Sequence, residues 1–493
     1  MAQVIEKIVR SKYPPRDTRV IWLDVTCNEF KVYTSAGWTS TTKPEQEKLA
    51  NEMYKLLVDS QGLENILAYG VEVDFSRGKS SPQCSRIGNS LYHKTLPVQS
   101  EFRGCIVKDG KFQYWLDPVN WNLKEDGTPS KLDGTDGSIM GYVPKHYFKF
   151  EELLKDEKGN VIKFRVWEST FKIDDDYVEV PAMYISSDRV TIDKSADKTV
   201  CVINTSTNYR GGGDRAAQDT YLETDAYRSD LGKPRTSISR GSLRTKARKA
   251  NEYILNYEFY KFVFYWNFVI EYATLNSQLA YNEALTSDSY HQGGLGAGFT
   301  EMKNWDKYNG YYPCIPIGYT NEFGNFSGVK NITIPTFIGT DDNSYKEQTI
   351  SVCRYRCFNQ PFGDIWTILD GYIGIGDGNN GQDIYTTKNP ELHNDSSIEG
   401  YDYKGKQTAP NGYYKYTIVG KDGEMIPTES NGDSTTYFCD YSYIGTTKDT
   451  KYTLLVGGPA HGNSPAGLGL FSSGSRVVDP KCNAGFRTFC FAE

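Results

Sequence analysis

The order of apolar and polar residues near the N-terminus predicts a β-hairpin followed by a helix. Two runs of strand-forming residues, 20–25 and 29–34, flank a short turn that contains Asn28, which is typical of a hairpin. Between Pro44 and Asp59 the apolar residues recur at the spacing of one helix face; they are Leu49, Met53, Leu56 and Leu57. A segment of this size buries too little apolar surface to be stable alone. We therefore expect residues 1–60 to attach to other subunits or to oligomerise.

The pattern changes after residue 60. Short apolar runs between residues 63 and 202 alternate with loops rich in Gly, Asp, Asn, Ser and Pro, which predicts short strands. Residues 251–284 carry the clearest helical pattern, in one or two pieces, and strands return from Thr300 onward. The sequence therefore predicts an α+β fold, with a β-rich part over residues 61–250 and a helix followed by strands over 251–493.

Aromatic residues make up 14% of the chain, with 37 Tyr, 23 Phe and 8 Trp. Tyrosine joins a large, rigid contact surface to a polar tip, which suits subunit interfaces and binding surfaces. Aromatic residues also favour strands, so a β-rich fold explains the same number. Both interpretations remain open.

The charge of the chain argues against nucleic acid as a partner, because 55 Lys and Arg face 62 Asp and Glu, a net charge of −7. One basic run is interpreted as a solvated face rather than a nucleic-acid patch; it comprises Arg235, Arg240, Arg244, Lys246, Arg248 and Lys249. The most apolar stretch, Tyr253 to Ala273, contains three charged residues, so we expect a buried helix and no membrane insertion. No secretory signal is recognisable at the N-terminus.

Neither the cysteines nor the carboxylates form a recognisable site. The ten cysteines are scattered, and we expect reduced, mostly buried thiols. The segment Asp377–Asp383 alternates oxygen-bearing residues around glycine, so an Asn/Gly-rich turn and a cation loop are both possible there. The adjacent carboxylates 174–176 do not by themselves make an acid and base pair. We therefore expect no cofactor and no catalytic residues.

Three segments of the second half resemble the C-type-lectin-like fold shared by formylglycine-generating enzymes and phage tropism determinants. Residues 362–366 (FGDIW) are similar to the GNVWEW segment of that family, residues 455–458 (LVGG) to its RGGSW strand, and residues 483–487 (NAGFR) to its closing GFR. Their order and spacing agree as well. Pro459 replaces the Ser-Trp that follows the two glycines in the family.

This resemblance implies a structural role for each segment. Trp366 would fill the core, Gly457 and Gly458 would allow close strand packing, and Gly485 would allow the last turn. It also implies that residues 61–493 form one large elaborated C-type-lectin-like domain.

Further segments resemble proteins encoded by phages and prophages of gut Bacteroidales, including the crAss-like phages. They are 266–300, 86–89, 132–137 and 209–213. The N-terminal stretch VIWLD…FKVYTSAGW resembles the short attachment module of phage fibre proteins, and we expect Trp22 and Trp38 in it to dock on other virion proteins. The resemblance implies a virion protein assembled in the host cytoplasm, a head or tail fibre or spike subunit that forms a homotrimer.

The enzymes of this fold carry a reactive cysteine pair between the GG strand and the GFR turn. Only Cys482 lies in that interval here, so the resemblance implies a protein that is not an enzyme. The EPN and WND calcium motifs of the carbohydrate-binding lectins are absent. The alternatives are an enzyme of the formylglycine-generating type, a surface-glycan hydrolase, and an architectural decoration protein without a receptor.

In the tropism determinants, the receptor-facing residues lie between the GG strand and the GFR turn. The matching stretch runs from Pro459 to Pro480 and contains four glycines, so its backbone can loop outward at little steric cost. The side chains implied to contact a host surface glycan or protein are His461, Asn463, Leu470, Phe471 and Arg476. An alternative for Leu470 and Phe471 is that they are core residues of the closing strands.

Overall fold

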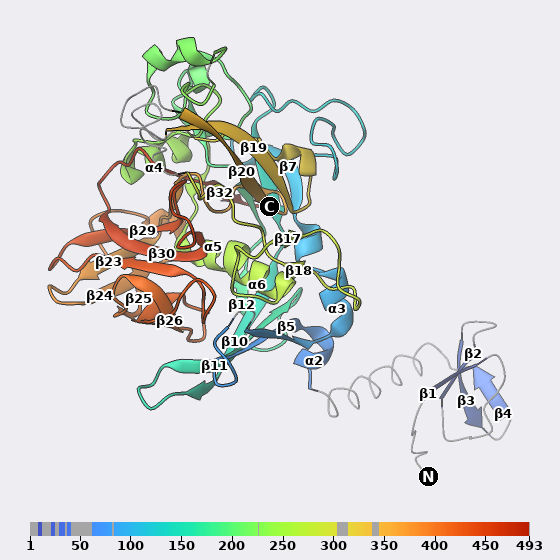
Figure 1. Ribbon diagram of the computed structural model, residues 1–493. Helices are drawn as coiled ribbons and strands as arrows, with labels where there is room; N and C mark the ends of the chain where they lie inside the picture. The colour runs from blue at the N-terminus through green and yellow to red at the C-terminus, as the bar shows by residue number, and fades with distance from the viewer. Residues whose placement is uncertain are drawn as a thin grey trace. The chain divides into compact units, whose positions relative to one another are not determined.

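The computed structural model describes residues 8–11, 21–24, 29–34, 37–40, 62–80, 83–224, 226–302, 314–337 and 345–492. The chain divides into two compact units, Met1–Ile66 and Leu67–Glu493, which are drawn in Figure 1. Among the described residues, no helix is long and apolar enough to span a bilayer.

The first unit contains a sheet with the strand order β1-β2-β3-β4. Its strands are β1 Ile8–Ser11, β2 Ile21–Asp24, β3 Glu29–Thr34 and β4 Gly37–Ser40. The predicted hairpin is confirmed, since β2 and β3 pair antiparallel with Leu23 opposite Phe30. It is extended by β4 on one side and by the parallel strand β1 on the other. The helix predicted between residues 44 and 59 lies outside the described residues.

In the second unit, two sheets come mainly from the first half of the chain. The five-stranded sheet has the order β12-β10-β11-β5-β6, with β5 Tyr69–Asp74, β6 Cys84–Gly88, β10 His146–Lys155, β11 Val161–Ser169 and β12 Val178–Val180. The six-stranded sheet has the order β16-β32-β13-β9-β7-β8, with β7 Arg103–Lys108, β8 Lys111–Trp115, β9 Ser138–Val143, β13 Met183–Ser186, β16 Tyr253–Ile254 and β32 Thr488–Phe491. The chain thus returns at β32 to a sheet built much earlier.

The largest sheet of the described residues comes from the last third of the chain, with the order β25-β24-β23-β29-β30-β28-β26-β27. In addition, β22 pairs with β29, and β31 pairs with β22. Its strands are β22 Trp366–Ile368, β23 Tyr372–Gly376, β24 Gln382–Thr386, β25 Asp402–Gln407, β26 Gly412–Ile418, β27 Ile426–Ser430, β28 Tyr441–Ile444, β29 Lys451–Gly457, β30 Gly467–Arg476 and β31 Ala484–Gly485. The smaller sheets are formed by β14 Thr191–Asp193, β15 Lys198–Val200, β17 Tyr281–Asn282, β18 Gln292–Gly293, β19 Gly328–Phe337, β20 Tyr345–Tyr355 and β21 Phe358–Asn359.

Helices are short and few in the described part of the chain. The α-helices are α2 Glu64–Leu67, α3 Ser90–Thr95, α4 Arg240–Lys249, α5 Tyr257–Tyr260 and α6 Asn267–Tyr272, and a π-helix, η4 Lys261–Trp266, joins the last two. The short 3₁₀ segments are η1 Gln99–Glu101, η2 Thr207–Tyr209, η3 Ala216–Tyr221, η6 Asn321–Phe323 and η7 Pro390–Leu392. The α+β prediction holds at this coarse level, with strands predominating.

The helix from α5 to α6 is the buried centre of the second unit, as predicted, but it is shorter than expected. Every residue of it is buried. Phe262 stacks on Phe148 of β10 at 5.2 Å between ring centroids, and the Tyr260 hydroxyl donates to the Leu468 carbonyl of β30. Figure 1 shows the helix between these two sheets. It ends at Ala273, whose φ of 53° is left-handed, a conformation that stops a helix.

The three segments that carry the resemblance are hydrogen-bonded neighbours. Strand β22 pairs antiparallel with β29 and parallel with β31, so Thr367 lies between Val456 and Gly485. Trp366 packs against the core but stays half-buried. The turn expected at Gly485 is wrong, because the residue lies in a strand, where an added Cβ would come within 3.0 Å of Ile365.

Gly457 and Gly458 have φ values of 85° and 91°, a backbone region that favours glycine. An added Cβ on Gly457 would lie 3.2 Å from Phe362 Cα. The expected close packing at this pair is therefore present.

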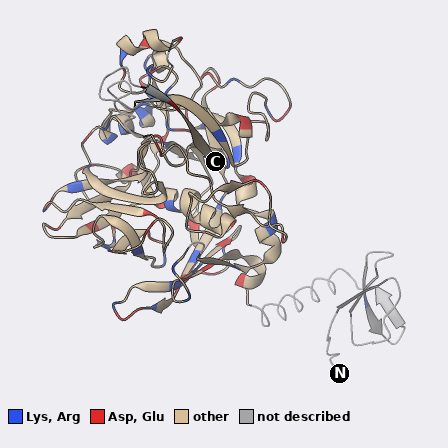
Figure 2. Ribbon diagram, in the orientation of Figure 1, with Lys and Arg blue, Asp and Glu red and all other residues tan. Residues whose placement is uncertain are grey.

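The basic run on and before α4 is only in part the solvated face that the sequence predicts, since Lys249 is exposed whereas Arg240 is buried. Its members pair with carboxylates from distant segments: Arg235 with Asp214, Arg240 with Asp370 and Asp395, Arg244 with the same two, Lys246 and Lys249 with Asp197, and Arg248 with Glu391. The Arg240 side chain is only 1% exposed. The run therefore fastens α4 to the rest of the unit. Figure 2 shows that basic and acidic residues are interspersed over the other elements of this unit as well.

Candidate functional site

The stretch that the resemblance marks as receptor-facing is a short loop followed by a long strand. Residues 458–466 connect β29 to β30, and β30 then runs from Gly467 to Arg476. Residues 467–473 of this strand are buried. The expectation that the whole stretch loops outward is therefore wrong, because only the connection, the end of the strand and residues 478–480 after it reach the surface.

Leu470 and Phe471, two of the five predicted contact residues, are core residues, each 1% exposed. Phe471 packs edge-on against Tyr257 and Tyr372, with ring centroids 6.2 and 5.9 Å apart. Leu470 lies under Gly458, where an added Cβ would come within 2.9 Å of its Cδ2 atom. In this conformation neither side chain can contact a receptor, so the alternative that places them in the core is the correct one.

The three polar residues of the prediction are exposed. His461 and Asn463 lie two positions apart in the loop, whereas Arg476 lies at the far end of β30. A ten-residue strand spans about 30 Å at ~3.3 Å per residue. The structure therefore brings His461 and Asn463 together and separates Arg476 from them.

The loop 458–466 is held at several points while these two side chains remain exposed. The Asn463 N–H donates to the Thr300 carbonyl at 2.8 Å, and Gln278 Nε2 donates to the Asn463 carbonyl at 3.0 Å. The Ser464 and Tyr413 hydroxyls are 2.6 Å apart. Asn463 has a φ of 51°, which asparagine tolerates better than most residues. A loop fixed in this way loses little conformational freedom when it binds a ligand.

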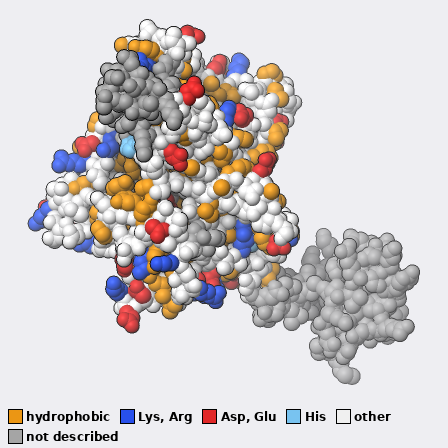
Figure 3. Space-filling view, viewed as in Figure 1, with side chains coloured by type: hydrophobic (Ala, Val, Ile, Leu, Met, Phe, Trp, Pro, Cys, Tyr) orange, Lys and Arg blue, Asp and Glu red, His pale blue; other side chains and the backbone are white. Residues whose placement is uncertain are grey.

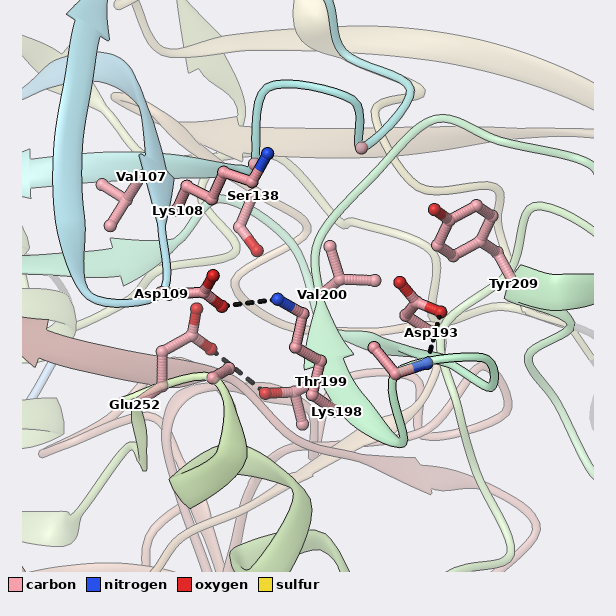
Figure 4. A pocket seen from close by; sticks show the side chains of 14 residues that line it. Val107, Lys108, Asp109, Ser138, Asp193, Lys198, Thr199, Val200, Tyr209 and Glu252 are labelled. Carbon is pink, nitrogen blue, oxygen red and sulfur yellow. Dashed lines mark hydrogen bonds and ion pairs between the residues drawn. The ribbon is translucent and has the colours of Figure 1, made fainter.

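A polar cavity of about 190 Å³ forms a second candidate site (Figure 4). Its walls come from β7, β9, β14, β15 and the segment that follows α4. Lys198 Nζ pairs with an Asp109 carboxylate oxygen at 2.5 Å, and the Thr199 hydroxyl donates to Glu252 at 3.2 Å. Figure 4 shows these side chains converging on the cavity.

The carboxylates of the cavity differ in their affinity for protons. Burial raises the pKa of Glu252 to about 7, against weaker opposing effects from Thr488 and Thr199. Burial also acts on Asp193, but hydrogen bonds from Ser195 and Asn208 outweigh it and hold the pKa of Asp193 below its ordinary value. Near neutral pH the cavity therefore offers one carboxyl that exchanges its proton and another that stays ionised.

Acid–base catalysis needs such a difference between two carboxyl groups. Asp109, Asp193 and Glu252 escaped the sequence analysis because they lie in three separate segments without a motif. The one sequence feature that pointed to Glu252 was its position shortly after a helix that ends in basic residues. This arrangement is too common to indicate a functional site.

Two other sequence candidates have structural roles. Asp377 accepts from the backbone N–H groups of Asn379 and Gly381 and pairs with Lys406 at 2.7 Å. The Lys406 ammonium group thus lies beside the carboxylate in the position that a bound cation would take. This favours an Asn/Gly-rich turn over a cation loop. Asp174 pairs with Lys149 at 2.8 Å and accepts from a backbone N–H two residues later, so it closes a turn.

The cysteines described by the structure are free thiols, and all except Cys84 and Cys482 are buried, which agrees with reduced, mostly buried thiols. Within the described residues, no group of three or more His, Cys, Asp or Glu is placed to hold a metal. Trp22 and Trp38 lie in β2 and β4, but their side chains fall outside the described part of the chain, so their role in attachment stays a prediction.

Comparison with known proteins adds no relative to this description. No protein-family model matches the chain, and no curated protein matches it.

Proposed function

We propose that this chain is a structural protein of a bacteriophage particle, a head or tail fibre or spike subunit. Residues 1–60 join it to other virion proteins, most simply as a homotrimer. Residues 61–493 form a C-type-lectin-like head that binds a glycan or protein on the host surface. The chain is assembled into the virion in the host cytoplasm and performs no catalysis.

One observation carries the proposal. The segments similar to the family's GNVWEW, RGGSW and GFR motifs are about 90 and 30 residues apart in the chain, yet β22, β29 and β31 are adjacent strands. Sequence segments resembling those of a fold should meet in space if the fold is shared, because strand pairing of this kind is set by the topology. Fold alone does not establish function, so the binding role rests on the loop 458–466, which connects β29 to β30.

The virion role is tested by locating the chain. Antibodies against residues 67–493 should label purified particles in immuno-electron microscopy, at one structure on every particle. Particles assembled with a chain that lacks residues 1–60 should not be labelled, whereas the truncated protein should remain folded. Unlabelled wild-type particles, or normal incorporation of the truncated chain, would contradict the proposal.

The binding role is tested at the loop. The double substitution His461→Ala and Asn463→Ala removes two exposed side chains and leaves the backbone contacts of the loop in place. We expect weaker adsorption of particles to host cells by a protein that stays folded. Its melting temperature should fall only slightly, because alanine tolerates the left-handed φ of 51° at position 463 less well than asparagine does. Lys448→Ala, an exposed position in another loop of the same sheet, is the control and should adsorb normally. Unchanged adsorption in the folded double variant would exclude this loop as the receptor site.

A surface-glycan hydrolase is the second candidate, and the cavity at Glu252 is the observation that favours it. Glu252 with a pKa of about 7 could serve as the general acid of such an enzyme. Release of reducing ends from host polysaccharide by the purified protein, lost in Glu252→Gln, would support it. An oxidase of the formylglycine-generating type is not favoured, because Cys482 has no second cysteine between residues 457 and 485.

A further inference from the structure

Four aromatic residues form a row on one face of the largest sheet. Tyr413 of β26 lies opposite Tyr441 of β28, and Tyr443 follows two residues later on the same side. Successive strand pairs then lead across the sheet to β22. Tyr443 lies opposite Ser472 of β30, Ser472 opposite Leu455 of β29, and Leu455 opposite Ile368 of β22. Because side chains alternate along a strand, Trp366, two residues before Ile368, shares this face. We call Tyr413, Tyr441, Tyr443 and Trp366 the aromatic strip.

The rings of the aromatic strip touch one another in sequence. Ring centroids are 5.2 Å apart between Tyr413 and Tyr441, 4.7 Å between Tyr441 and Tyr443, and 6.3 Å between Tyr443 and Trp366. Each of the four side chains is half-buried, so each keeps part of its ring in contact with solvent. In Figure 3 hydrophobic side chains, tyrosines included, gather over the region where Figure 1 draws β29 and β30.

The aromatic strip begins at the loop proposed to bind the receptor. The hydroxyl of Tyr413 lies 2.6 Å from the hydroxyl of Ser464, which is in the same loop as the exposed His461 and Asn463. Ring surfaces and polar loop groups are therefore continuous. An apolar centre beside groups that can hydrogen-bond is the usual composition of a recognition site.

The charge of the aromatic strip restricts its ligand. Burial raises the pKa of Tyr413 and of Tyr443 above the ordinary value, so both hydroxyls stay neutral. The indole of Trp366 is a neutral group. The four side chains of the aromatic strip thus offer hydroxyl groups and π-faces, and none of them is of a type that is permanently charged.

The size of the aromatic strip argues against a protein partner. A Tyr or Trp side chain offers about 150–250 Å² in total. Four half-buried rings therefore expose less than the ~800 Å² per partner that a stable protein interface buries. A single narrow row is instead the shape of an extended chain of small rings. Neighbouring rings are inclined to one another, by 76° between Tyr413 and Tyr441 and by 75° between Tyr443 and Trp366, so the strip offers a succession of separate ring faces and edges.

From these observations we infer that the aromatic strip binds a neutral polysaccharide, with the sugar rings lying along Tyr413, Tyr441, Tyr443 and Trp366 and their hydroxyl groups reaching the loop 458–466. The C–H bonds on the flat side of a pyranose carry a small positive charge and are attracted to the negative face of an aromatic ring. This inference rests on the proposed receptor-binding function, since it names the ligand class of the same surface.

The test is affinity electrophoresis of the full chain in gels that contain one polysaccharide each: dextran, laminarin, yeast mannan, and the capsular polysaccharide of the host strain. Polygalacturonate serves as the anionic counterpart. We expect retardation by at least one neutral polymer. Tyr441→Ala and Tyr443→Ala should each weaken that binding by about tenfold or more, as loss of an aromatic contact at the centre of a site typically does. Tyr403→Ala, a 57% exposed tyrosine on β25 of the same sheet, is the matched control and should bind normally.

The outcomes separate this inference from the proposed function. Binding to no neutral polymer, preference for polygalacturonate, or unchanged binding in both folded tyrosine variants would overturn the aromatic strip as a polysaccharide site. If adsorption then still depends on His461 and Asn463, the receptor-binding function stands with another class of ligand. If the tyrosine variants lose polysaccharide binding but particles are not labelled, the virion role fails and the aromatic strip remains supported.

Discussion

Replacing Glu168 by glutamine should stabilise the second unit at neutral pH. Glu168 lies in β11 and is fully buried, and its Oε2 atom accepts from Gln99 Nε2 at 2.7 Å. The basic atom nearest to it, His146 Nε2, is 3.9 Å from Oε1. Burial lowers the pKa of His146 to about 4, so this imidazole is uncharged at neutral pH. Burial without a cation raises the pKa of Glu168 to about 8.

The size of the effect follows from the two pKa values of Glu168. The unfolded chain releases this proton above about pH 4.3, whereas the folded protein retains it up to about pH 8. The stability contribution of the group is therefore complete at low pH and is lost as the pH rises through this window, at about 1.4 kcal/mol per pH unit. At about pH 7 the folded protein has lost on the order of 3 kcal/mol. Glutamine keeps the acceptor for Gln99 and binds no proton, so Glu168→Gln avoids this loss.

Denaturant unfolding followed by tryptophan fluorescence, from about pH 5 to about pH 8, measures the difference between the two proteins. Burial raises the pKa values of Glu252 and Asp364 to about 7. These two groups titrate in the wild type and in the variant alike, so their effect on the free energy of unfolding cancels in the difference between the two proteins. The advantage of Glu168→Gln should grow with pH. Glu399→Gln, at an exposed position, is the control and should show no such growth. A difference between Glu168→Gln and the wild type that stays constant over the pH range would refute the reasoning.

Three further predictions concern packing and organisation. Asp370→Asn removes the fully buried carboxylate that pairs with α4 at 2.8 Å and should lower the free energy of unfolding by about 3–5 kcal/mol in denaturant titrations. Gly104→Ala should lower the melting temperature, since the new Cβ would lie 2.4 Å from the Trp121 ring, whereas Gly78→Ala, in open space, should leave it unchanged. A chain without residues 1–60 should keep the thermal unfolding transition of Leu67–Glu493, and loss of its circular dichroism signal would contradict the division into units.

Patterns in the sequence predicted the elements that depend on neighbouring residues rather than on contacts with distant segments. The hairpin of β2 and β3 and the buried helix around Phe262 follow from runs of strand formers and from an apolar stretch too charged for a membrane. The extent of that helix was overestimated by several residues at both ends. Its stop at Ala273 is a backbone conformation, and alanine is otherwise a strong helix former.

Contacts between distant segments could not be predicted. Arg240 and Arg244 look solvated in the sequence because their partners, Asp370 and Asp395, follow more than 100 residues later. Leu470 and Phe471 were assigned to a binding loop because the resemblance places them between the GG strand and the GFR turn, in a stretch rich in glycine, yet these glycines allow close packing against β30. An added Cβ on Gly469 would come within 2.3 Å of Asp440. Glycine between apolar residues indicates either an open loop or a crowded strand, and only the tertiary structure distinguishes the two.

The position of β32 has a consequence for the synthesis of the protein. This strand pairs with β13 on one side and with β16 on the other, and its partners in β13 lie roughly 300 residues earlier in the chain, a contact of very high sequence separation. During synthesis, one edge of β13 therefore stays unpaired until residues 488–491 have left the ribosome. An open strand edge of this kind is a site for wrong pairing between nascent chains. Production of the protein should consequently depend on chaperones that shield β13 during translation, and slow translation of the last third of the message should favour aggregation.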